Sequence, residues 1–343
     1  MPVRWLADLV SDWLAHETGG LQDRLDALPH LSATIDGQLV HLVHVPGKGP
    51  DPFPLLLTHG WPSSFLEHEA LIPLLTDPQA AGGSAADAFS VVMPSLPGFV
   101  FSGGPPPGGL TYQAVATLWH QLMTEGLGYQ RYGAHGSDIG AGVTAWLARI
   151  APDSVAGIHL ATPGLAPPPR PWTPTVEAHL KELEAWTAEE GAYAHEHATK
   201  PSTLAAGLLD SPVGLAAWVG EKLTSWSAPA ALEPGFPRQL LLDTLTLYWA
   251  TGTIGSSLLP YWTYRHTAGA VLPIDHPPPV RTAINLFGGE RVPFPKPPRE
   301  LAERYFTLTG WAEHDRGGHF PAVAEPALLA NILRDFFRPL RQH

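Results

Sequence analysis

The sequence predicts an α/β fold in which a mostly parallel sheet is covered by helices on both faces. Short apolar segments alternate with segments of helical periodicity through the first half of the chain. Strands buried on both faces of a parallel sheet are almost continuously apolar, as these segments are. The length of 343 residues and a hydrophobic content of 44% suit one large domain or a core with a substantial insertion.

The first elements are a helix and a hairpin. Residues 3–14 carry apolar side chains at helical spacing with two aspartates between them. This pattern predicts an amphipathic helix rather than the uncharged core of a signal peptide. Ser32 to Ile35 and Leu39 to Val45, joined by Asp36-Gly37, read as two strands of a β-hairpin.

The next segments supply the predicted parallel sheet and its first covering helices. Each strand is a short apolar run, and a helical pattern separates most of them. The expected strands are Pro54 to Thr58, Phe89 to Pro94, Arg131 to Gly136 and Val155 to Ala161, and the expected helices are Thr111 to Glu125 and Ala141 to Ile150.

The alternation breaks after Gly164. Six prolines fall between Pro163 and Pro174, and helical periodicity dominates from Thr175 to about Tyr264. Strand character returns at Arg281 to Phe287 and at Tyr305 to Leu308. A last helix is expected at Pro326 to Phe337. We therefore predict a helical insertion at 166–272 between two parts of one core, 1–165 and 273–343. A separate C-terminal domain is the alternative, and the returning strands favour the insertion.

Composition excludes several classes of function. The net charge of −12 and the lack of a basic run argue against nucleic acid and anionic membranes as partners. No run of ~18 apolar residues occurs, so the sequence predicts a soluble, cytoplasmic protein. The absence of cysteine excludes thiolate chemistry and disulfides. His195-Glu196-His197 lacks the spacing of a zinc-binding helix, and no phosphate-binding glycine motif is present, so we expect neither metal nor cofactor.

A tight turn near the middle of the chain has a carboxylate at its centre. Gly136 and Gly140 flank Asp138 two positions away on each side, a spacing that fits a strand-to-helix nucleophile turn. A serine version centred on Ser137 would need glycine at position 135, where the chain has His135. An ordinary turn is the alternative interpretation of this motif. A carboxylate nucleophile forms alkyl esters at saturated carbon, whereas serine chiefly transfers acyl groups.

An aspartate nucleophile needs donors for an oxyanion, a base and an acid that orients the base. His59-Gly60-Trp61-Pro62 follows a predicted strand, and the Trp61 amide could point toward Asp138. The amide of Ile139, at the start of the following helix, is the expected second donor.

The base is expected late in the chain, because histidine comes last in this arrangement of nucleophile, acid and base. His319 follows Gly317-Gly318 after the last predicted strand, whereas His314 lacks such a loop and His343 is the chain end. Glu290 is the first carboxylate after the strand that ends at Phe287-Gly288-Gly289, and it is the predicted orienting acid. Asp275 and Asp315 are the alternatives.

At these motifs the chain resembles the epoxide hydrolases of the α/β-hydrolase superfamily, specifically the microsomal and juvenile-hormone type and their soluble bacterial relatives. The resemblance spans nearly the whole chain, and the motifs in the helical insertion are more diagnostic than the turn at Asp138. The matching segments are 26–30, 33–37, 41–45, 59–65, 94–99, 101–102, 132–142, 210–218, 248–254, 317–322 and 325–326. The resemblance implies an α/β-hydrolase fold whose helical cap is inserted late in the chain.

The resemblance also implies two cap tyrosines that hydrogen-bond the epoxide oxygen. Their positions match Tyr193 and Tyr261, with Tyr264 and Tyr248 competing for the second role. A phenol suits this task because it is protonated at neutral pH and still acidic enough to assist a leaving alkoxide. Most relatives have tryptophan directly after the nucleophile, whereas this chain has Ile139. That difference counts against a haloalkane dehalogenase, which uses the tryptophan side chain to hold halide.

Together these observations predict a cofactor-free epoxide hydrolase that uses water to convert an apolar epoxide to a vicinal diol. Asp138 would form a covalent ester, and His319 with Glu290 would activate the water that cleaves it. A Ser137 esterase, a haloalkane dehalogenase and a non-catalytic ligand-binding relative remain alternatives. A homo-oligomer is left open.

Overall fold

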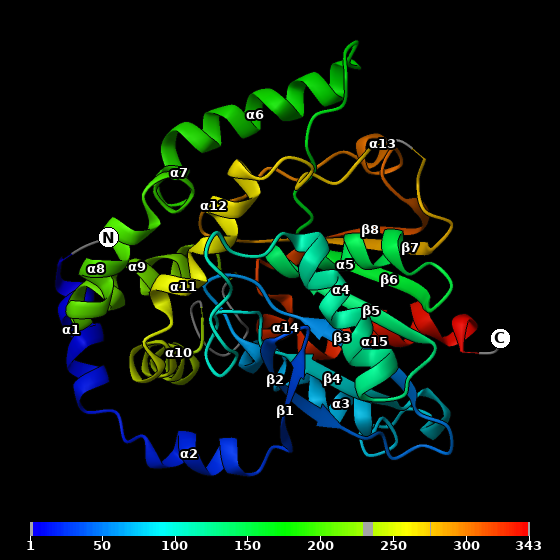
Figure 1. Ribbon diagram of the computed structural model, residues 1–343, viewed down its shortest axis with the longest axis horizontal. Coiled ribbons are helices and arrows are strands. Elements are labelled where there is room, and N and C mark those ends of the chain that lie inside the picture. Colours follow the sequence, from blue (N-terminus) through cyan, green and yellow to red (C-terminus); the bar gives the residue numbers. More distant parts are fainter. Residues whose placement is uncertain (1–2, 229–235, 275, 342–343) are drawn as a thin grey trace.

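The computed structural model describes residues 3–228, 236–274 and 276–341, and an eight-stranded sheet lies at its centre (Figure 1). The strand order is β1-β2-β4-β3-β5-β6-β7-β8. β1 pairs antiparallel with β2 and β2 antiparallel with β4, and every other pair is parallel. The predicted fold class is therefore confirmed. The strands are β1 (His30–Ile35), β2 (Gln38–Val45), β3 (Phe53–Thr58), β4 (Phe89–Pro94), β5 (Tyr132–Ser137), β6 (Val155–Ala161), β7 (Arg281–Gly288) and β8 (Thr307–Gly317).

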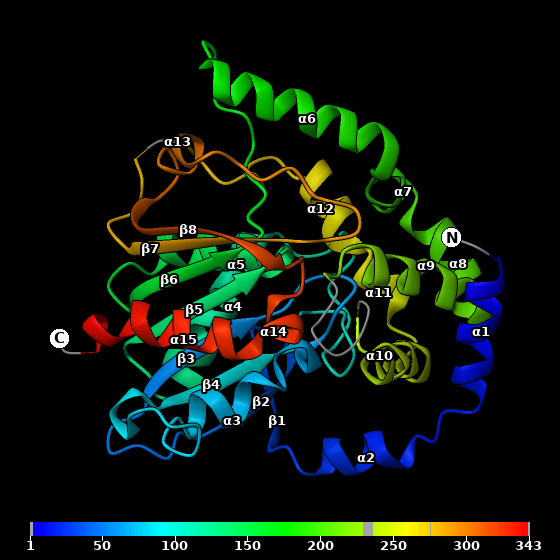
Figure 2. The same cartoon turned by 180° about the vertical axis from the view of Figure 1, so that it is seen from behind.

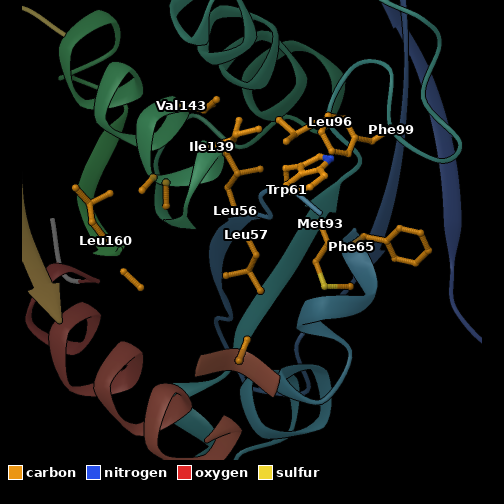
Figure 3. Packing of buried hydrophobic residues seen from close by; sticks show 14 of the residues in the cluster. Leu56, Leu57, Trp61, Phe65, Met93, Leu96, Phe99, Ile139, Val143 and Leu160 are labelled. Atoms are coloured by element: carbon orange, nitrogen blue, oxygen red, sulfur yellow. The ribbon is translucent and has the colours of Figure 1, made fainter. Parts of the chain in front are cut away.

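Helices cover both faces of this sheet. α4 (Tyr112–Gln121) and α5 (Ile139–Ile150) lie over the face seen in Figure 1, and α3 (Leu71–Thr76) and α15 (Pro326–Phe337) lie over the face seen in Figure 2. Figure 3 shows how apolar side chains of β3, β4 and α5, including Leu56, Met93 and Val143, meet in the core. Burial of such side chains is the main stabilising contribution to the fold.

The helices between β6 and β7 form a separate group at one end of the sheet (Figures 1 and 2). They are α6 (Pro174–Glu190), α7 (Ala192–Thr199), α8 (Pro201–Asp210), α9 (Pro212–Ser225), α10 (Arg238–Thr251), α11 (Ile254–Ser257) and α12 (Leu259–His266). The boundaries of the predicted cap, 166–272, stay a prediction. In the described part of the chain, no single helix is long and apolar enough to cross a membrane. The sharply bent pair α8 and α9 meets that test together, by length and composition only.

The N-terminal segment runs along these helices before it reaches the sheet. It contains the predicted amphipathic helix α1 (Val3–Leu14) and a second helix, α2 (Gly19–Asp26). The buried carboxylate of Asp243 on α10 lies 3.0 Å from His16 Nε2 and 2.7 Å from Arg24 Nη1. Arg24 also pairs with Glu69, so one partly buried ion cluster joins the N-terminal segment, α10 and the core.

Several element boundaries differ from the sequence predictions. The predicted helix 111–125 ends at Gln121 and continues as one turn of π-helix, η3 (Leu122–Gly126). α5 begins at Ile139 rather than at Ala141, because Asp138 alone forms the turn between β5 and α5. The predicted strand 305–308 begins two residues early and is too short, since β8 runs from Thr307 to Gly317 and therefore contains His314. β8 is an edge strand with a mixed burial pattern and shifts of register against β7. For this reason the sequence has no continuous apolar run that would indicate its full length.

The remaining short elements were not predicted. They are η1 (Phe65–His68), η2 (Ala85–Asp87), α13 (Arg299–Ala302), α14 (Pro321–Ala324) and η4 (Arg338–Leu340). Single turns carry too little periodicity to be recognised in a sequence. One of them, η1, matters for the site because its Glu67 accepts a hydrogen bond from Ser137, the residue before Asp138.

Candidate active site

Asp138 occupies the turn between β5 and α5 in a strained backbone conformation, with φ +53° and ψ −124°. Such a conformation is costly for a residue with a side chain and is typical of functional turns. The flanking glycines allow it: a Cβ on Gly140 would overlap the backbone of Thr58, and a Cβ on Gly136 would overlap the carbonyl of Gly140. The turn therefore presents the carboxylate at the carboxyl end of the parallel strands, as the glycine spacing predicts.

The predicted amide donors surround the Asp138 carboxylate. The Trp61 amide donates to Oδ1 at 3.0 Å, within the range of an oxyanion-binding contact. Burial alone would raise the pKa of Asp138, but His319 and the amides of Trp61 and Ile139 outweigh it and lower the pKa. The carboxylate is therefore ionised at neutral pH. The Trp61 ring is fully buried and stacks on Tyr193 with centroids 5.6 Å apart.

His319 reaches the same carboxylate from the loop after β8. Its Nε2 lies 3.5 Å from Oδ2 of Asp138, and its backbone amide donates to the Trp226 carbonyl at 3.0 Å. Gly317 and Gly318 both have positive φ, +106° and +60°, so the loop uses a conformation that glycine permits. The Nε2 atom is buried and has no hydrogen-bond partner among the described residues, which leaves it available to a water or substrate.

Glu290 follows β7 and is buried beside this pair. Burial raises the pKa of its carboxyl, although Lys296 and His319 act in the opposite direction. Its Oε1 has no hydrogen-bond partner, and no ion pair joins it to His319 in the described parts of the chain. Glu290 thus acts on His319 electrostatically without a hydrogen bond or ion pair between them in the described residues. Of the alternatives, Asp315 is exposed within β8, and Asp275 lies outside the described residues, as does His343.

The two predicted cap tyrosines face the nucleophile from α7 and α12. The rings of Tyr193 and Tyr261 meet edge to face with centroids 5.9 Å apart. Burial, together with the charge of Asp138, raises the pKa of both phenols, so both carry their protons at neutral pH. The Tyr261 hydroxyl is buried and has no hydrogen-bond partner within the described chain.

The competing tyrosines make other contacts, although Tyr264 lines the same cavity. Tyr248 is buried away from the cavity, and its hydroxyl donates to the Ser63 carbonyl at 3.1 Å. Tyr264 stacks on Tyr112 with centroids 5.4 Å apart. The geometry therefore favours Tyr261 over both as the second phenol.

A cavity of about 440 Å³ lies between these groups, a size that suits a small organic molecule. Asp138, Ile139, His319, Glu290, Tyr193 and Tyr261 all line it. Most of the remaining wall is apolar, with Trp146, Leu183, Trp186, Trp226, Leu272 and Phe294 among its side chains. Six of the seven predicted site residues thus share one cavity, and the seventh, Trp61, contributes its amide from behind Asp138.

Sequence reasoning missed three side chains of this region. Tyr112 at the start of α4 and Trp226 after α9 line the cavity, and Glu67 on η1 lies buried beneath Asp138. Glu67 follows the His59-Gly60-Trp61-Pro62 motif by only a few residues. This closeness to an expected functional turn is the sequence feature that could have indicated a role for it. The chain has twelve tryptophans, and no motif in the sequence distinguishes Trp226 from the others. In the structure its ring centroid lies 4.9 Å from that of His319.

Ser137 and the histidines do not offer an alternative centre. Ser137 is buried, lies outside the cavity and donates its hydroxyl proton to Glu67 at 3.2 Å. Within the described residues, no group of three or more histidine, aspartate or glutamate side chains could hold a metal ion.

An aspartate on a strand-to-helix turn, a late histidine and a cavity at the carboxyl ends of parallel strands define an enzyme with the α/β-hydrolase fold. Residues 54–210 match the family described as alpha/beta hydrolase fold, and residues 1–68 match the one described as epoxide hydrolase N terminus.

Comparison with individual proteins narrows this class. A relative from Stigmatella aurantiaca is 38% identical over 346 residues, which cover 99% of this chain and 77% of the relative. Epoxide hydrolase 1 of Oryctolagus cuniculus is 33% identical over a segment that covers 91% of this chain and 74% of that relative. The crystal structure of juvenile hormone epoxide hydrolase from the silkworm Bombyx mori superposes with a TM-score of 0.84 at 28% identity, covering 98% of this chain and 85% of that chain. The chain belongs to the epoxide hydrolase family.

Proposed function

We propose that this enzyme opens apolar epoxides through a covalent ester on Asp138 and releases a vicinal diol. The observation that carries the proposal is the position of the Asp138 carboxylate. One oxygen accepts the Trp61 amide at 3.0 Å, and the other lies 3.5 Å from His319 Nε2 at the wall of a largely apolar cavity.

In the first step, Asp138 attacks an oxirane carbon while Tyr193 and Tyr261 donate to the epoxide oxygen. The carboxylate is ionised and both phenols are protonated at neutral pH, so each group is in the state that the step requires. The C–O bond of the epoxide breaks as the ester bond forms, and the oxygen leaves as a hydroxyl that has taken a phenolic proton.

In the second step, His319 removes a proton from water, and the resulting hydroxide attacks the carbonyl carbon of the ester. The amides of Trp61 and Ile139 stabilise the oxyanion that forms, as donors at this distance do in acyl-transfer enzymes. Glu290 stabilises the imidazolium electrostatically from the cavity wall. The tetrahedral intermediate then expels the diol oxygen, which takes the proton held by His319. The proton left on the Asp138 carboxyl returns to the phenolate, so Asp138 recovers its charge and both tyrosines are protonated again.

The apolar cavity wall supports an apolar substrate. Its aromatic side chains would contact an aryl or bulky alkyl group, while the polar groups cluster at the end where the epoxide reacts. A panel of aryl, alkyl and disubstituted epoxides would define this preference. Faster turnover of small polar epoxides than of aryl epoxides would contradict the proposed substrate class.

Single-turnover hydrolysis in H₂¹⁸O tests the covalent route. With enzyme in excess, ¹⁸O is expected in the carboxylate of Asp138 and not in the first diol released, because the diol oxygen comes from the aspartate. Label in that first diol would refute the ester. Hydrolysis of simple esters that survives Asp138→Ala but is lost in Ser137→Ala would instead support the serine esterase.

A further inference from the structure

Glu67 is a buried carboxyl group that the proposed steps do not use. It lies on η1 with 3% of its surface exposed and outside the cavity, so it does not meet substrate. The hydroxyl of Ser137, the residue before the nucleophile, donates to its Oε1 at 3.2 Å. The turn that carries it is fixed, because Ser64 caps η1 and Tyr248 holds the Ser63 carbonyl.

The surroundings of Glu67 link it to both reacting side chains. Two titratable groups act on it from other elements, Asp138 at the start of α5 and His319 after β8, while its neighbour on η1, His68, is kept neutral by burial. Burial raises the pKa of Glu67 from 4.5 to about 7, although the hydroxyls of Ser63 and Ser137 and the charge of His319 act to lower it. His319 therefore lies in the electric field of two carboxyl groups, Glu67 outside the cavity and Glu290 at its wall.

We propose that Glu67 is a positioning residue for the second half-reaction, in which its carboxylate stabilises the imidazolium form of His319 from beneath the nucleophile. This inference rests on the proposed ester on Asp138. Glu290 makes no hydrogen bond or ion pair with His319 in the described chain, so one acid does not hold the ring by itself. A second buried carboxylate supplies the missing negative charge.

The charge of Glu67 follows the state of the nucleophile. The negative charge of Asp138 raises the pKa of Glu67, and ester formation removes that charge. Proton uptake by His319 then adds a positive charge, which lowers the pKa of Glu67 further. The ionised fraction of Glu67 therefore rises while the ester exists, and the proton it loses passes to solvent. When Asp138 is freed and His319 gives up its proton, the pKa of Glu67 rises again, and its ionised fraction returns to the starting value.

Glu67→Gln separates this role from the first step. Rapid-quench mass spectrometry with styrene oxide measures formation and decay of the esterified protein as two rates. We expect ester decay to slow at least tenfold at pH 7.5 and ester formation to change less than twofold. Glu67→Asp keeps the charge and should recover much of the decay rate. Glu69→Gln is the matched control, since it removes a neighbouring carboxylate that pairs with Arg24 outside the cavity, and it should alter neither rate.

The pH profile of ester decay gives a readout that a purely structural role would not move. In the wild type, decay should accelerate as Glu67 ionises, and Glu67→Gln should remove that rise while leaving any other rise in the profile. Equal slowing of both steps, or an unchanged decay rate and profile, would overturn the inference. If Glu67→Gln does not fold, Glu67→Asp carries the test, with a shifted decay profile as the expected result and an unshifted one as the contrary result. Failure of the wild type to form any ester would overturn the proposed function itself.

Discussion

Gly60 packs directly against the nucleophile, and its replacement by alanine tests the geometry of the site. A Cβ at this position would lie 2.5 Å from Oδ1 of Asp138 and 2.8 Å from its Cγ, whereas ordinary contacts begin at 3.4 Å. The carboxylate would have to move by about 1 Å, and the strained turn and the Trp61 amide oppose that movement. A displacement of about 1 Å at a reacting group costs roughly 100-fold in rate. That factor corresponds to about 3 kcal/mol of transition-state stabilisation.

The assay is kcat/KM for an aryl epoxide, combined with the yield of esterified protein in a single turnover. Gly60→Ala should lose about 100-fold in kcat/KM, and its ester yield should fall in the first milliseconds, because attack by Asp138 is the step affected. Gly104→Ala is the control, since a Cβ there has nothing within 4 Å. A Gly60→Ala enzyme that folds normally and keeps more than half of its activity would refute the idea that this carboxylate attacks from its present position.

Three further predictions follow from the same geometry. His319→Gln should let the ester on Asp138 accumulate, because no base remains to activate water, and intact mass should show protein plus substrate; rapid decay of the adduct would exclude this role. Tyr193→Phe and Tyr261→Phe should each lower the rate of ester formation about 10- to 100-fold and leave its decay nearly unchanged, and slower decay with normal formation would contradict the assignment. The folded pKa of Glu67, about 7, exceeds the ordinary value of 4.5, so ionisation in the unfolded chain should cost the wild type about 3 kcal/mol of stability as pH rises from about 4.5 to 7. The free energy of unfolding of Glu67→Gln, measured with urea, should not fall over this pH range. If the difference in that free energy between wild type and variant is the same at pH 5 and pH 8, the prediction is contradicted.

Much of the fold could be predicted because its signals are local. The strands β4 and β6 were predicted with their observed limits, since each is an apolar run bounded by turn residues. β8 was predicted too short because a half-exposed edge strand with polar side chains and Gly310 lacks such a run. The position of Asp138 was readable from Gly136 and Gly140, because the strained turn leaves no room for larger residues at those places.

The contacts around the site could not be predicted in the same way. The spacing of residues in the chain indicated Glu290, but not that its carboxyl stays out of hydrogen-bonding contact with His319. Cap tyrosines could be ranked only by resemblance, whereas the structure distinguishes them by what their hydroxyl groups touch. Tyr248 has a backbone partner and Tyr261 has none among the described residues. Such distinctions depend on tertiary packing, which brings α7, α10 and α12 together at one end of the sheet.

Glu67 is the residue near the site that the sequence analysis most clearly failed to predict, and its burial explains why. Its neighbours Phe65, Leu66 and His68 are all buried, so a leucine at position 67 would match the pattern of the segment and avoid the cost of burying a carboxyl. The burial of that carboxyl is opposed by about 3 kcal/mol once it ionises, a large fraction of the stability of a typical domain. A side chain that breaks the local pattern at such a cost is expected where charge is needed for function. Because the two charges that most directly surround it belong to Asp138 and His319, the cost is explained if the charge of Glu67 acts during hydrolysis of the ester.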